Sequence, residues 1–177
     1  MQSARLPGLK DTRGSIPLSL LVIAASLREN GHTPHIIDFS TMDVPSAKNS
    51  DERTAYFLKY FQPVIDEHNI LLIGITCFST MHYPLTTELA QIVKTSNPSV
   101  KIATGGAHPT YFGKEILTHD QNFDFVAEGE GEDTFVLLAD LIEAESKGEE
   151  CEFTIKDIQA LKYRDEDLKV SENVRVS

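Results

Sequence analysis

The feature that most constrains the fold is an alternation of two apolar patterns along the chain. Short, continuous apolar segments rich in Ile and Val have the length of buried strands. Between them lie longer stretches with apolar residues three or four positions apart, which is the spacing of one helix face. A parallel pair of strands needs a crossover connection, usually a helix. We therefore predict a parallel sheet with helices on both faces.

Four segments have the strand pattern and four have the helix pattern. The strands are predicted at residues 35–39 (HIIDF), 70–76 (ILLIGIT), 100–104 (VKIAT) and 123–127 (FDFVA). The helices are predicted over roughly 17–30, 54–67, 84–95 and 134–145. Pro63 should kink or divide the second helix, because proline removes a backbone donor. The strand at 70–76 is almost continuously apolar, as expected for a strand covered on both faces.

The 177 residues suffice for one domain with a sizeable core, and the chain divides into three parts. Residues 1–15 contain proline and glycine without a strand-like run, so we predict a loop. Residues 16–150 carry the alternating pattern and form the predicted α/β domain. Residues 151–177 are predicted to form a C-terminal hairpin, with strands at 159–164 and 168–174.

The charge balance and the cysteine count exclude several kinds of partner. The 27 acidic and 16 basic residues give a net charge of −11, which argues against nucleic acid, because neutralising phosphates requires clustered Lys and Arg. No apolar run approaches the ~20 residues that span a bilayer, and the first ten residues lack a secretory signal, so we expect no membrane partner and a cytoplasmic location. Cys77 and Cys151 form no ligand cluster, so no zinc or iron–sulfur site is predicted.

Function is best sought where the strands end, since ligands of parallel sheets bind outside the carboxyl ends of the strands. The segment 76–83 follows the second predicted strand and supplies the hydroxyls of Thr76, Ser79 and Thr80 beside two aromatic rings. These hydroxyls are candidate ligand contacts, and capping of the next helix by Ser79 or Thr80 is the alternative. Cys77 is interpreted as a small buried residue, because no partner base is identifiable.

The segment after the third predicted strand is Gly105-Gly106-Ala107-His108. Paired glycines at a strand end let a ligand approach the backbone closely or permit a positive φ. His108 on this loop is a candidate ligand contact, and a structural role is the alternative. Neither a GxGxxG nor a GxxxxGK[ST] loop is present, so a nucleotide has no direct support.

The segment after the fourth predicted strand is Glu128-Gly129-Glu130-Gly131. Glycines at alternate positions fit a tight strand-to-helix turn. The two acidic residues that follow are explained by the helix macrodipole, which favours negative charge at a helix N-terminus. That explanation accounts less well for Glu128 and the glycines, so this turn is a third candidate wall of the site.

The order of these segments is more informative than any one of them. Successive segments, above all GGAHPT and AEGEGEDTF, resemble the N-terminal cobalamin (vitamin B12)-binding domain of B12-dependent radical S-adenosylmethionine (SAM) proteins, from about residue 17 to about 174. The resemblance implies a Rossmann-like, flavodoxin-type sheet with the corrin ring across its carboxyl edge and the nucleotide tail beside it. It also implies a radical SAM partner domain, in the parent protein or in a separate chain.

The resemblance places residues of all three strand-end segments around the cofactor. Those implied to line the tail or the underside of the corrin are Thr76, Ser79 and Thr80. Those implied to border both tail and corrin are Gly105, Gly106 and His108. Those implied to form the far wall are Glu128, Gly129 and Glu130. A corrin needs an apolar shelf, polar donors at its rim and glycines where the backbone comes close, and this set offers all three.

The sequence departs from the family in three respects. The DxHxxG motif, whose histidine coordinates cobalt in methionine-synthase-type domains, is absent, so we expect base-off cobalamin without a protein imidazole, with His108 as the alternative lower ligand. Nothing before Ile16 can be the family's apolar first strand, so the chain is truncated or the sheet lacks that strand. No CxxxCxxC is present, so we predict no cluster and no catalysis by this chain alone, within a methyltransferase-like parent enzyme.

Two other functions stay open. The chain is alternatively a non-catalytic remnant or interaction module that keeps the fold without the cofactor, as the missing strand suggests. It is alternatively a flavodoxin-like domain for another small ligand, such as a flavin or a nucleotide, because one topology serves many ligands. A receiver domain is disfavoured, since the acidic pair expected after the first strand is missing along with that strand.

Overall fold

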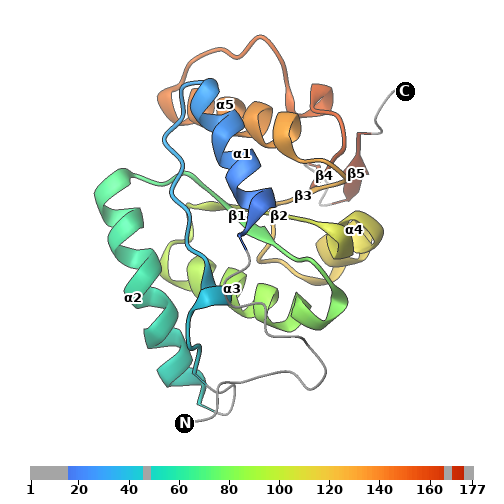
Figure 1. Ribbon diagram of the computed structural model, residues 1–177. Helices are drawn as coiled ribbons and strands as arrows, with labels where there is room; N and C mark the ends of the chain where they lie inside the picture. The colour runs from blue at the N-terminus through green and yellow to red at the C-terminus, as the bar shows by residue number, and fades with distance from the viewer. Residues whose placement is uncertain (1–15, 46–48, 166–168, 174–177) are drawn as a thin grey trace.

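The computed structural model describes residues 16–45, 49–165 and 169–173, which form a central sheet between two layers of helices (Figure 1). The helices are α1 (Leu18–Glu29), α2 (Ser50–His68), α3 (Tyr83–Ser96), α4 (Ala107–His119) and α5 (Glu132–Lys147). The strands are β1 (Leu72–Thr76), β2 (Lys101–Gly105), β3 (Phe125–Ala127), β4 (Leu161–Arg164) and β5 (Val170–Glu172). Short 3-10 turns lie at η1 (Phe39–Thr41), η2 (Thr80–His82) and η3 (Ile155–Asp157).

The sheet follows the chain order β1-β2-β3-β4-β5. The first three strands are parallel, with Ile73 of β1 opposite Ile102 of β2, whereas β4 and β5 are antiparallel to their neighbours. The predicted parallel sheet and the predicted C-terminal hairpin are therefore confirmed. The carboxyl ends of β1, β2 and β3 lie at one edge, and the start of antiparallel β4 lies at the same edge.

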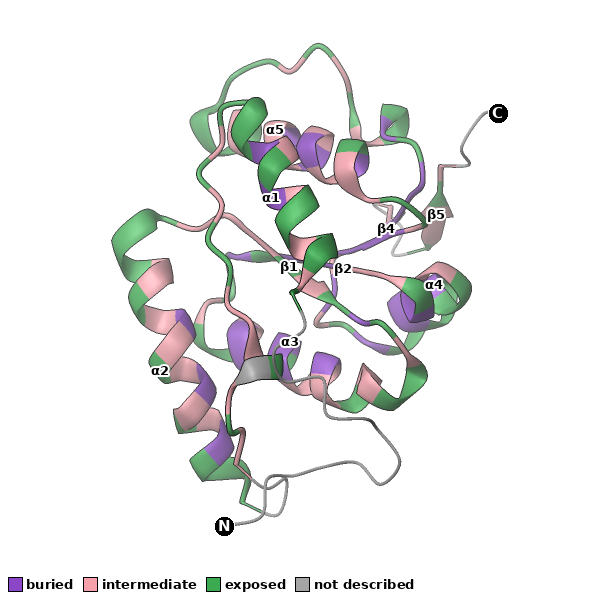
Figure 2. Cartoon of the chain, viewed as in Figure 1, coloured by how far each residue is buried: buried purple, intermediate pink, exposed green. Residues whose placement is uncertain are grey.

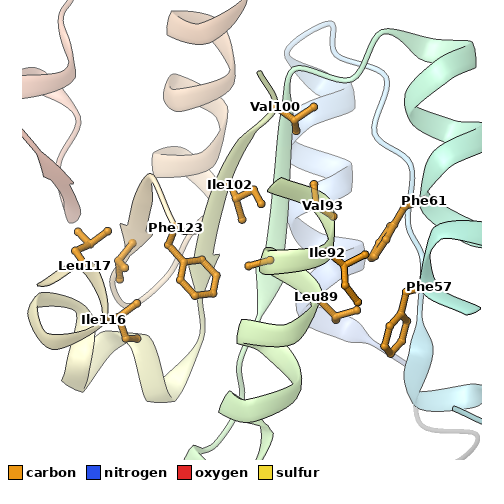
Figure 3. Packing of buried hydrophobic residues seen from close by; sticks show 12 residues of the cluster. Phe57, Phe61, Leu89, Ile92, Val93, Val100, Ile102, Ile116, Leu117 and Phe123 are labelled. Atoms are coloured by element: carbon orange, nitrogen blue, oxygen red, sulfur yellow. The ribbon is translucent and has the colours of Figure 1, made fainter. Parts of the chain in front are cut away.

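Two apolar clusters hold the layers together. Helices α2, α3 and α4 cover one face of the sheet, while α1 and α5 lie on the other (Figure 1). On the first face, Phe57 and Phe61 of α2 point toward Leu89 and Ile92 of α3 (Figure 3). On the second face, α5 buries Leu138 against strands β3 and β4. The layered core agrees with the predicted alternation of strands and helices.

The prediction of a strand at 35–39 is wrong. The strand at 70–76 packs against apolar clusters on both faces, as predicted, but two of its residues are more exposed than the apolar pattern indicates. Residues 32–38 run without strand pairing into η1. In β1, Gly74 and Thr76 are exposed. Both differences have one cause: β1 is an edge strand, and no residue in the described ranges forms a strand on its outer side.

Helix α1 is the least covered element of the second layer. It packs along α5 and buries Ala24 and Leu27, whereas Leu18, Leu21 and Val22 are exposed. Figure 2 shows α1 with mostly exposed residues. No strand precedes α1 among the described residues, and the expectation of a missing first strand stays a prediction. The predicted loop at 1–15 lies outside the described residues.

Two helices differ from their predictions. The prediction that Pro63 divides the second helix is wrong, because α2 continues from Ser50 to His68 with Pro63 inside it. Pro63 is exposed, so water can reach the carbonyl that its missing N–H leaves unpaired. The helix α4 was not predicted, and His108 lies in its first turn instead of on a loop.

Candidate functional site

The carboxyl edge of the sheet brings the three predicted strand-end segments together. The Cys77 amide donates to the Gly105 carbonyl at 2.8 Å, and the His108 amide donates to the Cys77 carbonyl at 3.3 Å. Gly106 has φ +108°, and a Cβ there would lie 2.8 Å from the Cys77 carbonyl oxygen. A side chain is thus excluded at Gly106 both by the backbone angle and by the close approach of the neighbouring loop.

His108 connects two of these segments through its side chain. Its Nδ1 lies 3.1 Å from Thr80 Oγ1. Its ring centroid lies 4.8 Å from the rings of both Tyr83 and Phe112, so the imidazole is held between two aromatic side chains. The residue is buried. These contacts hold the His108 ring in one position at the edge of the candidate site.

Of the hydroxyl groups in the segment 76–83, those of Ser79 and Thr80 form side-chain hydrogen bonds, whereas that of Thr76 forms none to any residue that the structure describes. Ser79 Oγ lies 2.8 Å from His82 Nδ1 and makes no capping bond, so the alternative of capping by Ser79 is wrong. Thr76 is exposed at the end of β1, and no side-chain hydrogen bond of Thr76 occurs within the described residues. Burial raises the pKa of the Cys77 thiol, which agrees with the interpretation of Cys77 as a small buried residue.

The second and third segments are joined by a residue that the sequence analysis did not select. Thr110 Oγ1 donates to the Gly106 carbonyl at 2.9 Å and accepts from the Gly129 amide at 3.0 Å. Gly129 has φ +65°, and a Cβ there would meet nothing within 4 Å. Glu130 is exposed beside it. Thr110 is in the GGAHPT motif, but its bridging role depends on the start of α4, which was not predicted.

Glu128 is engaged with the protein and does not extend freely from the turn. Its Oε1 lies 2.8 Å from Nζ of Lys162, a buried side chain of β4. Lys162 is not predictable as a site residue from the sequence, because nothing near it resembles a binding motif. A lysine opposite a strand-end glutamate is visible only once β4 is known to pair with β3.

Large apolar side chains are exposed around this network. They are Phe78 (77% exposed), Met81 (49%), Tyr111 (80%) and Phe112 (46%). All four follow the carboxyl end of β1 or β2 closely. An exposed group of this kind, beside polar groups and a glycine turn, has the composition of a binding surface for a large, partly apolar ligand.

The described parts of the chain contain no group of three or more His, Cys, Asp or Glu side chains arranged to hold a metal ion. Among the same residues, no helix has the length and apolar character needed to cross a bilayer.

A mostly parallel sheet with helices on both faces, and with its unusual residues collected at the carboxyl edge, defines an α/β ligand-binding domain. The comparison with known families specifies the ligand class. Residues 14–139 match the B12 binding domain family, so the chain belongs to the B12-binding domains.

Two curated relatives are similar in sequence. The anaerobic magnesium-protoporphyrin IX monomethyl ester cyclase of Synechocystis sp. is 31% identical over 127 residues, which cover 72% of this chain and 23% of the relative. The cytidylyl-2-hydroxyethylphosphonate methyltransferase of Streptomyces wedmorensis is 29% identical over 164 residues, which cover 89% and 29%. The chain thus spans about a quarter of the length of these relatives.

A solved structure shares the fold. It is the cobalamin-dependent S-adenosylmethionine radical enzyme OxsB with aqua-cobalamin and S-adenosylmethionine bound, at a TM-score of 0.65 and 19% identity. The match covers 92% of this chain and 20% of that chain. The predicted Rossmann-like fold and the predicted family are therefore confirmed.

Proposed function

We propose that this chain holds cobalamin across the carboxyl edge of its sheet for a radical SAM domain, which is in the parent protein or in a separate chain. The observation that carries the proposal is that hydrogen bonds join the three strand-end segments at the carboxyl edge. Cys77, Gly106, Thr110 and Gly129 connect three strand-end segments by hydrogen bonds, and exposed aromatic side chains lie next to them. Such a surface is preorganised for a broad ligand.

The residues present suit the parts of the cofactor. The apolar side chains at the edge suit the face of a corrin ring. The free hydroxyl of Thr76 and the open side of Gly129 suit the amide groups at its rim. The proposed set is completed by Ser79, Thr80, Gly105, Gly106, His108, Glu128 and Glu130, with His108 beside the cofactor and not on cobalt. When bound, cobalamin would supply a cobalt centre able to carry a methyl group.

We propose further that the cofactor is bound base-off, without a protein imidazole on cobalt. His108 is the histidine to consider, but its Nδ1 is engaged with Thr80 and its ring is held between Tyr83 and Phe112. Ligation would have to use Nε2, on a residue that is only 8% exposed. A His108→Ala variant should therefore retain cobalamin with an unchanged absorption spectrum, whereas a changed spectrum would assign His108 to the cobalt.

Reconstitution tests the main proposal. The purified chain is mixed with hydroxocobalamin, passed through a desalting column and examined for retained corrin absorbance. Retention at micromolar cobalamin is the expected result, and a chain that emerges colourless would overturn the proposal.

One observation favours a second candidate, a domain that keeps the fold without the cofactor. The outer side of β1 lacks a neighbouring strand within the described residues, and the loop after β1 is part of the proposed site. Thermal unfolding separates the two functions, because a ligand that binds only the folded state raises its stability. A melting temperature that cobalamin does not change would support the second candidate.

A further inference from the structure

The hairpin β4–β5 lies beyond residue 139, where the match to the B12 binding domain family ends, yet it contributes a side chain to the carboxyl edge. Lys162 is the second residue of β4, and its side chain is only 10% exposed. Its Cδ lies 3.0 Å from the position that a Cβ of Gly113 would take. The aliphatic part of Lys162 is therefore packed between β4 and α4, which limits where its ammonium group can lie.

The ammonium group of Lys162 is neutralised by two carboxylates. Its Nζ lies 2.8 Å from Glu128 Oε1 and 2.5 Å from Glu172 Oε2. Burial lowers the pKa of Lys162, but its hydrogen bonds to Glu128 and Glu172 outweigh this effect, and the net pKa is raised. The side chain consequently stays charged near neutral pH, and a buried charge of this kind keeps its partners close.

Glu128 begins the 128–131 turn, and the hairpin anchors this turn at two points. The Glu128 amide donates to the Ala160 carbonyl at 2.9 Å, and the Glu128 carboxylate is held by Lys162. A third anchor comes from α4, where Thr110 accepts from the Gly129 amide. The turn has no apolar side chain of its own between Glu128 and Gly131, so these polar contacts determine its position.

We infer that Lys162 is a positioning residue, which fixes the 128–131 turn through Glu128 and thereby sets the affinity of the domain for the corrin. This inference rests on the proposed function. It makes the C-terminal hairpin a working part of the binding site, although the hairpin is not itself expected to touch the cofactor.

The test compares Lys162 of β4 with Lys94, a partly buried lysine of helix α3 that forms an ion pair at the other edge of the sheet. Lys162→Met removes the anchor at the carboxyl edge. Lys94→Met is the matched control, because Lys94 pairs with Asp124 at 2.7 Å with a similarly shielded side chain, but lies at the opposite, amino edge. Hydroxocobalamin titrations give the dissociation constant of each variant, and urea unfolding gives its stability. Amide hydrogen exchange at Gly129 reports the turn directly and needs no ligand.

We expect both variants to lose stability, but only K162M to bind cobalamin roughly tenfold more weakly and to exchange the Gly129 amide faster, since loss of a supporting contact commonly has this effect on a site. Lys162→Arg, which keeps the charge, should restore part of the affinity. If K162M does not fold, K162M/E172Q removes one charge of each sign, leaves Glu128 unsubstituted but without its lysine, and is measured in the same way. Wild-type affinity in K162M, or equal weakening in K94M, overturns the inference.

Different results would overturn the proposed function and the role inferred for Lys162. A wild-type chain that retains no cobalamin would overturn the proposed function, and with it the role of Lys162 in affinity. In that case the exchange of the Gly129 amide would still decide whether Lys162 fixes the turn.

Discussion

The amino and carboxyl edges of the sheet differ in how far their polar and apolar groups are paired within the protein. At the amino edge, Lys94 pairs with Asp124 and also donates to the Val100 carbonyl at 2.8 Å, and the same carboxylate accepts from the Ile102 amide. At the carboxyl edge, Thr76 and several aromatic side chains are left exposed. The Lys94–Asp124 pair at the amino edge is therefore satisfied within the protein, while the carboxyl edge has groups available for a ligand. Substitutions at the first should change stability, and substitutions at the second should also change binding.

The largest effect is expected from Gly106→Ala at the carboxyl edge. The new methyl group would lie 2.8 Å from the Cys77 carbonyl oxygen at a φ of +108°, so the two loops would have to separate. We expect a loss of about 3 kcal/mol in the free energy of unfolding, measured with urea, together with a loss of cobalamin retention.

Gly129→Ala is the control for this substitution, because Gly129 also has a positive φ but open space around its Cβ position. It should cost about 1 kcal/mol, the strain of the backbone angle alone. If both variants lost the same stability, the close contact between Gly106 and Cys77 would have no energetic role.

Arg164→Met at the amino edge should cause the next largest loss in the free energy of unfolding. It should leave the affinity for cobalamin unchanged. The Arg164 guanidinium donates to the carbonyls of Leu117, Asp120 and Phe123, which lie at the end of α4 and before β3. Removing it leaves shielded carbonyls without their donors, at a cost of about 2 kcal/mol. Urea unfolding measures that loss. Weakened cobalamin binding in the folded fraction of R164M would contradict the separation between the two edges.

The double variant Phe78→Ser/Tyr111→Ser should weaken cobalamin binding and leave stability nearly unchanged. Both side chains are more than three-quarters exposed, so their replacement should alter the free energy of unfolding by no more than about 0.5 kcal/mol. The corrin would lose apolar contacts, and we expect its dissociation constant to rise about tenfold, which corresponds to about 1.4 kcal/mol. Ile36→Ser, an exposed apolar residue away from the site, is the control and should leave affinity unchanged.

The smallest effect concerns the pH dependence of stability near the C-terminal end of α5. A hydrogen bond from Lys147, with a further contribution from His32, lowers the pKa of Glu143. A carboxylate with a lowered folded-state pKa adds stability above its ordinary pKa and loses it as the pH falls through the lowered value. Because Glu143 is substantially exposed, Glu143→Gln should flatten this acid limb by less than about 0.5 kcal/mol. Unfolding midpoints measured from pH 7 to pH 3 test this, and an unchanged acid limb would contradict it.

The sequence predicted the layers of the fold better than it predicted the contacts of the site. Apolar spacing is a local signal, so β2, β3 and α5 were placed nearly at their observed positions. The prediction of a strand at 35–39 is wrong because a strand needs a neighbouring strand to pair with. The apolar pattern of the segment does not indicate whether such a strand is present. The pairing of Lys162 with Glu128 was equally inaccessible, because a contact between residues this far apart in the chain depends on the path of the hairpin. The cofactor contacts predicted for the nine residues of the three strand-end segments all stay predictions.

The open side of β1 has a consequence for the behaviour of the protein in solution. An edge strand presents unpaired backbone donors and acceptors to any other extended chain, including a second molecule of the same protein. Leu18, Leu21 and Val22 of α1 are exposed as well, while the net charge of −11 makes the molecules repel one another. Because salt screens that repulsion, self-association should increase with ionic strength, and the sample should be most nearly monodisperse in dilute buffer.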